Sequence, residues 1–533
     1  MHITRVYIDG FKCLRNFDLE MSPATNIIVG DNGTGKTSVL EAINLALSCQ
    51  FDGRHIKFAM DPYFFNSNAV EEYIAAVHSG SPSPPPKILI EVYFNDDPML
   101  AKLKGRNNER CDDCPGLGLS LELGNGCTEA LREYVKDDSN PKLIPVEYYE
   151  PIWLSFAGNP ITWRDVPFKA KMIDTSLARR YRGPNRYVAQ VVNDVLAPEQ
   201  RNQLSLAYKR LRHAFTQEEG VAAINQHLAT QGNTATKKRL TVQMDVSSRA
   251  TWDSAITAHL DDLPFDCVGK GEQCRVQMRL AIASAAKSHV LLVEEPENHL
   301  SHSNMNMLME EIGAQIDNQQ QTIVTTHSAF VLNKLGIDNL RLLSPNGVMT
   351  LANLTPDTKD YFMKLPGYNT LRLLLSKRSI LVEGPSDELI VQRAYRDKHG
   401  KLPLEDGTDV ISVDSLAFKR FLEIAQLLKL DVCVVTDNDG KVEAVKKKYE
   451  DYINKDDKNV RIVYDDDETC STLEPQLLRA NSLKALNGIF GTKHESEEDM
   501  LKYMGNNKTK CALRMFETKD TWKAPGYIAD AIE

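Results

Sequence analysis

Apolar and acidic residues alternate at 17–21 (FDLEM), which predicts a β-strand with one buried face. The run at 26–29 (NIIV) is of the buried-strand type and leads into a glycine-rich loop. From 37 to 49 the apolar residues take helical spacing. The chain therefore opens as strand, strand, loop and helix, the order of an α/β domain.

Two more segments have strand patterns, 88–94 and 240–246, the second with strict alternation. The segment 79–86 predicts a loop, because three consecutive prolines cannot continue a helix or a central strand. Residues 150–235 are mainly helical in pattern and are expected to be an insertion into the α/β domain. A second α/β pattern begins near 376.

These patterns predict an α/β protein of two domains. We expect the first at 1–335, a junction at 336–375 and the second at 376–533. A chain of 533 residues is longer than one hydrophobic core usually supports, which agrees with this division.

Composition narrows the class of protein. The chain is 42% hydrophobic and 26% charged, as in ordinary globular proteins, and no apolar run approaches the ~20 residues of a membrane span. The first residues do not resemble a secretory signal, so we expect a cytoplasmic protein with no membrane partner. Cys111, Cys114 and Cys127 form the one local cysteine cluster, and without a fourth ligand they are expected to be free thiols.

The formal net charge is −10, which argues against indiscriminate binding to nucleic acid. One stretch, 163–213, has the opposite character, with eleven Lys and Arg against four acids. It includes Arg179, Arg180 and Arg182, which are candidates for weak DNA contacts. A solvated helical surface explains the same charges equally well, and both interpretations stay open.

The glycine-rich loop matches a nucleotide-binding pattern. Residues 30–37 (GDNGTGKT) fit G-x-x-x-x-G-K-[ST] between a strand and a helix, where backbone N–H groups can surround phosphates. Lys36 adds a charge near the terminal phosphates, and the Thr37 hydroxyl can bind Mg²⁺. The residues expected to bind ATP here are Asn32, Gly33, Gly35, Lys36, Thr37 and Ser38.

A second acidic pair completes this site. The apolar run at 290–293 ends in Glu294 and Glu295. Two carboxylates at the end of a strand suit one Mg²⁺ contact and one general base for water. We assign Glu294 to the metal and Glu295 to the water.

The order of these motifs resembles the ABC-type ATPases of the RecF, SMC and OLD group. The resemblance places Gly269, Gly271 and Gln273 in the signature that faces ATP, 298–301 in the D-loop, and His327 in the γ-phosphate switch. In such ATPases the signature acts across a dimer. The resemblance therefore implies a homodimer or a higher assembly of dimers.

The C-terminal part carries a second set of acids. A buried-type strand ends in Glu383, and a second ends just before Asp437 and Asp439. Ligand sites in open α/β sheets form beyond the carboxyl ends of the strands. If the two strands are neighbours, these acids converge, and a divalent cation would neutralise them.

A Glu-Gly strand followed by Asp-x-Asp closely resembles the Toprim domain. An ABC ATPase joined to a C-terminal Toprim domain resembles the overcoming-lysogenization-defect (OLD) nucleases. That resemblance adds Asp387 and Glu474 to the metal ligands and makes Lys508 the group that stabilises charge on the scissile phosphate. It implies an ATP-binding and ATP-hydrolysing DNA endonuclease that uses Mg²⁺ or Mn²⁺, with two metals in the Toprim site. It further implies a role in bacterial anti-phage defence, in some relatives beside a partner such as a retron reverse transcriptase with its nucleic acid.

Three alternatives remain open at this point. A RecF- or SMC-like repair ATPase could carry a Toprim domain that binds nucleic acid without cutting it. A topoisomerase-like transesterase would need a nucleophilic Tyr, and none of the 18 tyrosines lies in a recognisable motif. A non-catalytic scaffold is least favoured, since both acid sets look complete.

Overall fold

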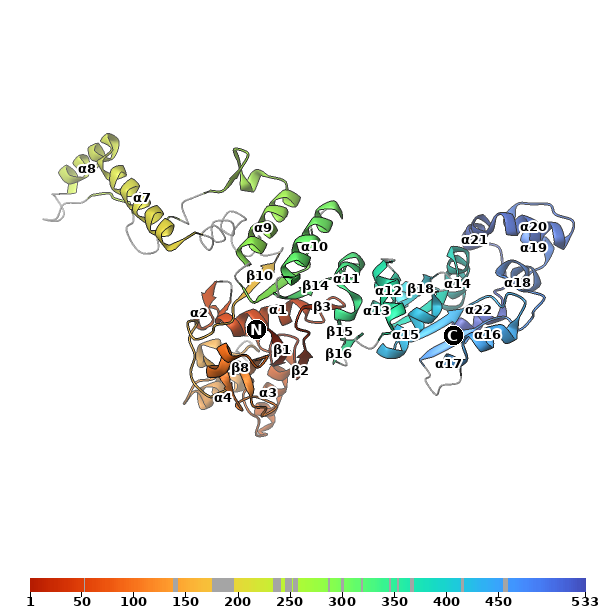
Figure 1. Ribbon diagram of the computed structural model, residues 1–533, viewed down its shortest axis with the longest axis horizontal. Helices are drawn as coiled ribbons and strands as arrows, with labels where there is room; N and C mark the ends of the chain where they lie inside the picture. Colours follow the sequence, from red (N-terminus) through yellow and green to blue (C-terminus); the bar gives the residue numbers. More distant parts are fainter. Residues whose placement is uncertain are drawn as a thin grey trace. The chain divides into compact units, whose positions relative to one another are not determined.

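The structure is a computed structural model, and the described part of the chain forms two compact units (Figure 1). Unit 1 consists of 1–25 and 37–325, and unit 2 of 26–36 and 326–533. The described residues are 1–51, 53–137, 142–174, 196–232, 241–244, 252, 257–285, 288–298, 302–317, 320–344, 347–351, 354–364, 369–413, 417–453 and 459–533.

Unit 1 contains an antiparallel sheet in which β2, β1, β6, β8 and β7 are neighbours in this order, with β9 also paired to β8. Its core side chains, such as Val6 and Val92, face each other across adjacent strands and are fully buried. The strands expected near 17–21 and 88–94 are present, and the proline segment runs as a loop between α3 and β6. The bounds are β1 Ile3–Asp9, β2 Phe17–Glu20, α3 Ser67–Ser79, β6 Ile88–Phe94, β7 Lys104–Gly105, β8 Cys114–Leu123, α4 Thr128–Lys136 and β9 Tyr149–Ser155.

Unit 1 also holds three parallel strands, β10, β13 and β14, which continue directly into the ATPase motifs. Gln321, fully buried at the start of β14, connects them to the antiparallel sheet. Its side chain accepts a hydrogen bond from Ile3 N and donates to Ile3 O and Ser22 O, each at 2.8 Å. The bounds are α1 Lys36–Ser48, β10 Ala170–Asp174, α9 Lys270–Ala285, β13 Val290–Glu294, α10 His302–Asp317 and β14 Gln321–Thr325.

The region expected as a helical insertion, 150–235, begins with strands. β9 begins at its edge and β10 lies inside it, and each strand belongs to a sheet, so only the later part of the region is helical. That part consists of α7 (Pro198–Gln217) and α8 (Glu219–Gly232), coloured yellow in Figure 1.

The strand predicted at 240–246 is wrong over its described part, since 241–244 form no strand. The side chain of Asn225 on α8 instead pairs with Val242, accepting from its N at 2.6 Å and donating to its O at 3.1 Å.

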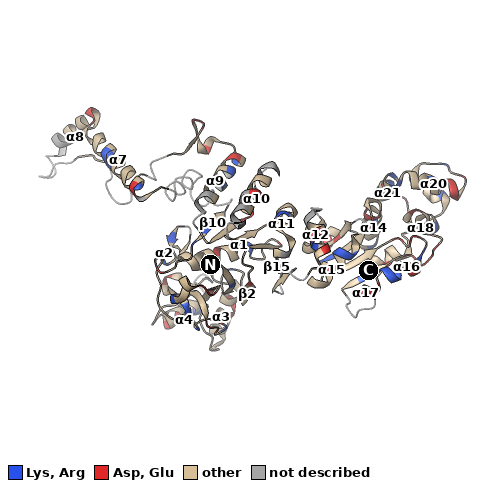
Figure 2. Cartoon of the chain, viewed as in Figure 1, with Lys and Arg blue, Asp and Glu red and all other residues tan. Residues whose placement is uncertain are grey.

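The basic stretch is only partly described, and Arg179, Arg180 and Arg182 lie outside the described residues. Four of its other cations lie on α7: Arg201, Lys209, Arg210 and Arg212 (Figure 2). Arg212 is buried and stacks over the ring of Tyr208 at 4.7 Å. At least one arginine of the stretch therefore packs within the protein instead of facing solvent.

Unit 2 begins with the strand that precedes the nucleotide loop. β3 (Thr25–Gly30) pairs in parallel with β15 (Leu340–Ser344), which pairs antiparallel with β16 (Gly347–Thr350). The segment 336–375, expected as a junction, is thus built from strands and from the helices α12 (Pro356–Lys364) and α13 (Asn369–Leu375). α11 (Ala329–Leu335) precedes them.

The rest of unit 2 is a four-stranded parallel sheet of order β18-β17-β19-β20. Side chains of β17 alternate between its two faces: Leu381 belongs to one core, and Ile380 and Val382 to the other. The bounds are β17 Arg378–Val382, α14 Pro385–His399, β18 Thr408–Ser412, α15 Phe418–Leu428, β19 Asp431–Val435, α16 Val442–Lys448, β20 Val460–Val463, α18 Leu473–Ala480, α21 Lys508–Glu517 and α22 Gly526–Ala531.

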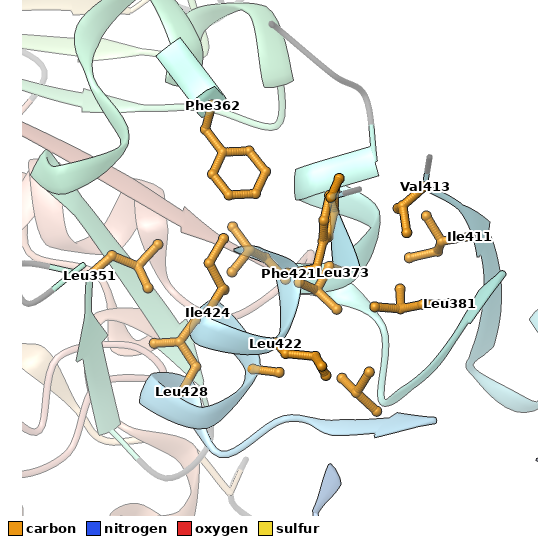
Figure 3. Packing of buried hydrophobic residues seen from close by; sticks show 14 of the residues in the cluster. Leu351, Phe362, Leu373, Leu381, Ile411, Val413, Phe421, Leu422, Ile424 and Leu428 are labelled. Carbon is orange, nitrogen blue, oxygen red and sulfur yellow. The ribbon is translucent and has the colours of Figure 1, made fainter. Parts of the chain in front are cut away.

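The core that contains Leu381 is continuous through unit 2. It joins Ile27 and Val29 of β3 to residues of α12, α13 and α15. Figure 3 shows part of this core, with Phe362, Leu373 and Phe421 among the labelled side chains. Phe362 of α12 meets Phe421 of α15 edge to face, with ring centroids 5.2 Å apart. The strand of the nucleotide loop and the C-terminal sheet therefore belong to one packed body.

None of the described helices combines the length and apolar character that a transmembrane segment needs.

Candidate functional site

The nucleotide loop has the turned backbone that phosphate binding requires. Gly33 and Gly35 have φ values of +82° and +97°, which only glycine adopts readily. At Gly30 a Cβ atom would come within 2.7 Å of the Thr34 hydroxyl and 2.9 Å of the Leu343 carbonyl oxygen, so a side chain is excluded there. Lys36 is buried, and its ammonium donates to the carbonyl oxygens of Gly30 and Asp31, both at 2.9 Å.

The two halves of the predicted magnesium site meet. The Thr37 hydroxyl donates a hydrogen bond to Glu294 Oε1, although 257 positions separate them in the chain. Glu294 ends β13 and is buried. A hydroxyl and a carboxylate in contact at the end of a parallel strand are suitable ligands for Mg²⁺.

Glu295, the next residue, has its own set of contacts. Its backbone has a φ of +38°, and its N–H donates to Thr325 O at 2.9 Å. Its carboxylate accepts from Asn298 Nδ2 at 2.8 Å. The two adjacent carboxylates thus have different partners, Thr37 for Glu294 and Asn298 for Glu295.

The signature residues lie where α9 begins. The side chain of Gln273 donates to Phe265 O at 2.7 Å and Val268 O at 2.8 Å, so it fastens the turn that precedes the helix. Gly269 and Gly271 line a pocket of about 540 Å³ beside this turn.

The remaining ATPase motifs follow the ends of β13 and β14. His327 is half-buried just after β14, where Thr326 N donates to Ile28 O at 3.1 Å. Of the expected D-loop, Asn298 is described, and 299–301 lie outside the described residues.

In unit 2, the strands that carry the C-terminal acids are neighbours. β17 and β19 run parallel with Val382 opposite Val435, so Glu383 and Asp437 emerge at the same edge. Glu383 Oε1 accepts from the Thr436 hydroxyl at 2.7 Å and from Asp437 N at 3.1 Å. Glu383 and Asp437 therefore lie together, as predicted from the sequence. Thr436 is a further residue of this site, and it was not predicted.

Burial, and then the neighbouring acids, raise the pKa values of two carboxyl groups at this edge. Burial raises the pKa of Asp437 to about 8, with further contributions from the negative charges of Asp387, Glu383, Glu474 and Asp439. Burial, and then the charge of Glu383, raises the pKa of Asp387 to about 6. Five carboxyl groups thus lie close enough to repel one another, a situation that bound cations relieve.

Lys508 and Glu474 form an ion pair at this edge, with Nζ and Oε1 3.2 Å apart. Glu474 is buried near the start of α18 and also accepts from the Thr472 hydroxyl at 3.0 Å. The Lys508 side chain is 55% exposed, so its ammonium remains accessible from solvent.

The carboxylate set fits hard divalent cations such as Mg²⁺ or Mn²⁺, which prefer oxygen ligands. Throughout the described residues, no three His, Cys, Asp or Glu side chains stand in a ready-made metal-binding geometry. The acids gather in one place, and side-chain rotation would still be needed for them to enclose an ion.

Family comparisons agree with this two-part construction. Residues 374–439 match a family described as overcoming lysogenization defect protein-like, TOPRIM domain. Residues 1–143 match an AAA ATPase domain, and 258–333 match an AAA domain described as a putative AbiEii toxin of a type IV toxin–antitoxin system. The chain therefore combines matches to ATPase domains with a match to the OLD-like Toprim family in its C-terminal part. Its N-terminal ATPase fold and C-terminal Toprim domain are those expected from the sequence.

Individual relatives cover less of the chain. DNA replication and repair protein RecF of Actinobacillus pleuropneumoniae serotype 5b (strain L20) is 56% identical over 43 residues, 8% of this chain and 12% of that protein. RecF of Enterobacter sp. (strain 638) matches to the same extent. The chain thus spans 12% of the length of these curated relatives.

Two solved structures are similar in part. The C-terminal region of the Burkholderia pseudomallei OLD protein is 17% identical, covers 30% of this chain and 95% of its own, and gives a TM-score of 0.25. The SMC head domain from Thermotoga maritima is 14% identical, covers 66% of this chain and 99% of its own, and gives a TM-score of 0.30.

Proposed function

We propose that this protein is a DNA endonuclease of the OLD type that requires a divalent metal and is controlled by ATP. The observation that carries the proposal is the convergence of acids at the edge of the Toprim sheet. Glu383 Oε1 accepts a hydrogen bond from Asp437 N, which follows the adjacent strand. The pKa of Asp437 is raised by burial and by four neighbouring carboxylates. Carboxyl groups that are buried together in spite of their mutual repulsion are typical of a metal-dependent phosphodiesterase site.

Each residue of this edge has a proposed role. Glu383, Asp387, Asp437, Asp439 and Glu474 would hold Mg²⁺ or Mn²⁺, in a site for two ions. Such ions lower the pKa of bound water and offset charge on the phosphate. Lys508, paired with Glu474 and open to solvent, would place its ammonium against the phosphate oxygen that gains charge.

The ATP side of the proposal rests on unit 1 and the nucleotide loop. Lys36 would bind the terminal phosphates, and Thr37 with Glu294 would hold Mg²⁺. Glu295 would orient the attacking water, because its carboxylate is held by Asn298, whereas that of Glu294 contacts Thr37. We further propose a homodimer or an assembly of dimers, in which the 269–273 signature reaches the nucleotide of the partner subunit.

The biological setting is proposed from the family alone. From the resemblance to OLD-like proteins we propose a role in bacterial anti-phage defence, and we propose a cytoplasmic location. A partner such as a retron reverse transcriptase with its nucleic acid is one candidate for the activating signal.

The test separates the two activities on the same preparations. The wild type and Asp437→Ala are incubated with supercoiled plasmid, ATP and either Mg²⁺ or Mn²⁺, and both DNA cleavage and phosphate release are measured. We expect Asp437→Ala to lose cleavage and to keep its ATPase rate, because the two acid sets belong to different sheets. Full cleavage by Asp437→Ala would refute the Toprim nuclease assignment.

A second candidate function is a RecF- or SMC-like repair ATPase whose Toprim domain binds DNA without cutting it. A 43-residue segment that is 56% identical to RecF favours it. Wild-type protein that hydrolyses ATP and binds plasmid, but leaves it intact with either metal, would support this candidate.

A further inference from the structure

Asn438 lies between two of the proposed metal ligands, and its side chain faces the protein interior. It is fully buried. Its amide nitrogen donates to Asp465 O at 2.8 Å and Asp467 O at 2.9 Å, and its amide oxygen accepts from Gly440 N at 2.8 Å. Three of the four hydrogen bonds that an Asn side chain can make are thus directed to backbone groups.

The backbone that Asn438 holds is the segment 465–471, which leads from β20 to the helix that carries Glu474. The same segment accepts two more hydrogen bonds from residues that follow β19. Asp439 N donates to Ser471 O at 3.2 Å, and Val442 N donates to Glu468 Oε1 at 3.0 Å.

Two side chains of α18 also contact the segment 465–471. Arg479 forms ion pairs with Asp465 and with Asp467, the latter at 2.8 Å. Gln476 donates to Cys470 O at 3.0 Å and accepts from the buried Tyr527 hydroxyl of α22 at 2.5 Å. The turn after β19 and the start of α18 are thus joined through one hydrogen-bonded segment.

We propose that Asn438 is a positioning residue that sets the separation between the acids after β19 and Glu474 on α18. This inference rests on the proposed metal site. Asp437 and Asp439 flank Asn438 in the chain, and Glu474 follows the segment that Asn438 binds. Without this connection, ligands from two elements would move independently, and a cation would have to order them on binding.

The variant Asn438→Asp tests the inference with almost no change in shape. It replaces the two N–H donors with an oxygen that faces two carbonyl oxygens. Loss of groups that orient metal ligands commonly weakens metal affinity or activity by about 10–100-fold. We expect the Mn²⁺ concentration for half-maximal binding, measured by calorimetry on the full chain, to rise by that factor. Cleavage should recover at high Mn²⁺, and ATP hydrolysis should not change.

Asn481 supplies a matched control in the same unit. It is buried, donates to Leu477 O and Lys523 O at 2.9 Å each, and accepts from Lys523 N at 2.8 Å. Asn481→Asp removes the same set of bonds at the far end of α18 from Glu474. It should lower thermal stability to a comparable degree while leaving Mn²⁺ affinity near the wild-type value.

The outcomes distinguish this inference from the proposed function. Wild-type protein that binds Mn²⁺ without cutting DNA would refute the nuclease, yet calorimetry would still test Asn438. Asn438→Asp protein that is folded and binds Mn²⁺ as tightly as the wild type would overturn the positioning role. If Asn438→Asp does not fold, Arg479→Ala replaces it, because this variant removes the ion pairs that hold the same segment. Arg479→Ala should weaken Mn²⁺ binding. Unchanged Mn²⁺ binding by Arg479→Ala would also overturn the positioning role.

Discussion

Replacing Lys36 with Ala should weaken ATP binding by a factor that follows from its contacts. Lys36 is 5% exposed, and its ammonium is held by two carbonyl oxygens at 2.9 Å, so it is already placed within the nucleotide loop. A hydrogen bond that involves a charged group contributes about 1.5–3 kcal/mol. Loss of one such bond to phosphate corresponds to roughly 10–150-fold weaker binding.

The same change should leave the protein folded. It removes the partner of two carbonyl groups, Gly30 O and Asp31 O, and Asp31 is exposed, so water can replace the ammonium there. The expected cost in stability is about 1 kcal/mol, within the range for single substitutions. Ala is also a favourable residue for the first position of a helix.

The assay is a titration with a fluorescent ATP analogue in the presence of Mg²⁺, together with phosphate release and thermal unfolding. Lys57→Ala, which removes an exposed lysine of α2 (Ile56–Ala59), is the control and should behave as the wild type. A folded Lys36→Ala protein with wild-type affinity and turnover would show that the loop at 30–37 is not the ATP site.

Two more predictions concern the ATPase unit. Glu295→Gln should retain ATP binding and slow hydrolysis by roughly 10²–10⁴-fold, the usual contribution of a general base. Glu294→Gln should instead weaken Mg²⁺-dependent ATP binding. A wild-type hydrolysis rate for Glu295→Gln would exclude Glu295 as the base. Gln321→Met keeps the volume but leaves Ile3 N, Ile3 O and Ser22 O without this partner. At about 1–3 kcal/mol for each buried group left unsatisfied, loss of the two bonds to the buried Ile3 alone should cost unit 1 roughly 2–6 kcal/mol. Urea unfolding measures the loss, and an unchanged midpoint would show that these three bonds contribute little.

The nucleotide loop and the main strands could be predicted from the sequence because their signals are local. Phosphate binding needs glycines at fixed positions between a strand and a helix, and 25–48 supplies all of them in one continuous segment. The strands that lead to Glu294, Glu383 and Asp437 are short apolar runs, and an acid ends or closely follows each of them. A single window of sequence contains this pattern.

Local patterns failed where partners distant in sequence decide the structure. Alternation at 240–246 predicted a strand, but over 241–244 the backbone pairs with the side chain of Asn225. The segment 336–375 has a weak pattern of its own, and it becomes ordered by pairing with β3 and by packing in the core that contains Leu381. Pairing and packing of this kind depend on the whole chain.

In the candidate nuclease site, too, some features follow from local sequence and others from contacts between distant segments. The sequence by itself determined which acids follow which strands, since that depends on adjacent residues. Only the tertiary structure decided that β17 and β19 are neighbours, which brings Glu383 to Asp437. It also decided that Asn438 faces inward, because its partners, Asp465 and Asp467, come from a segment 27 and 29 residues further along the chain.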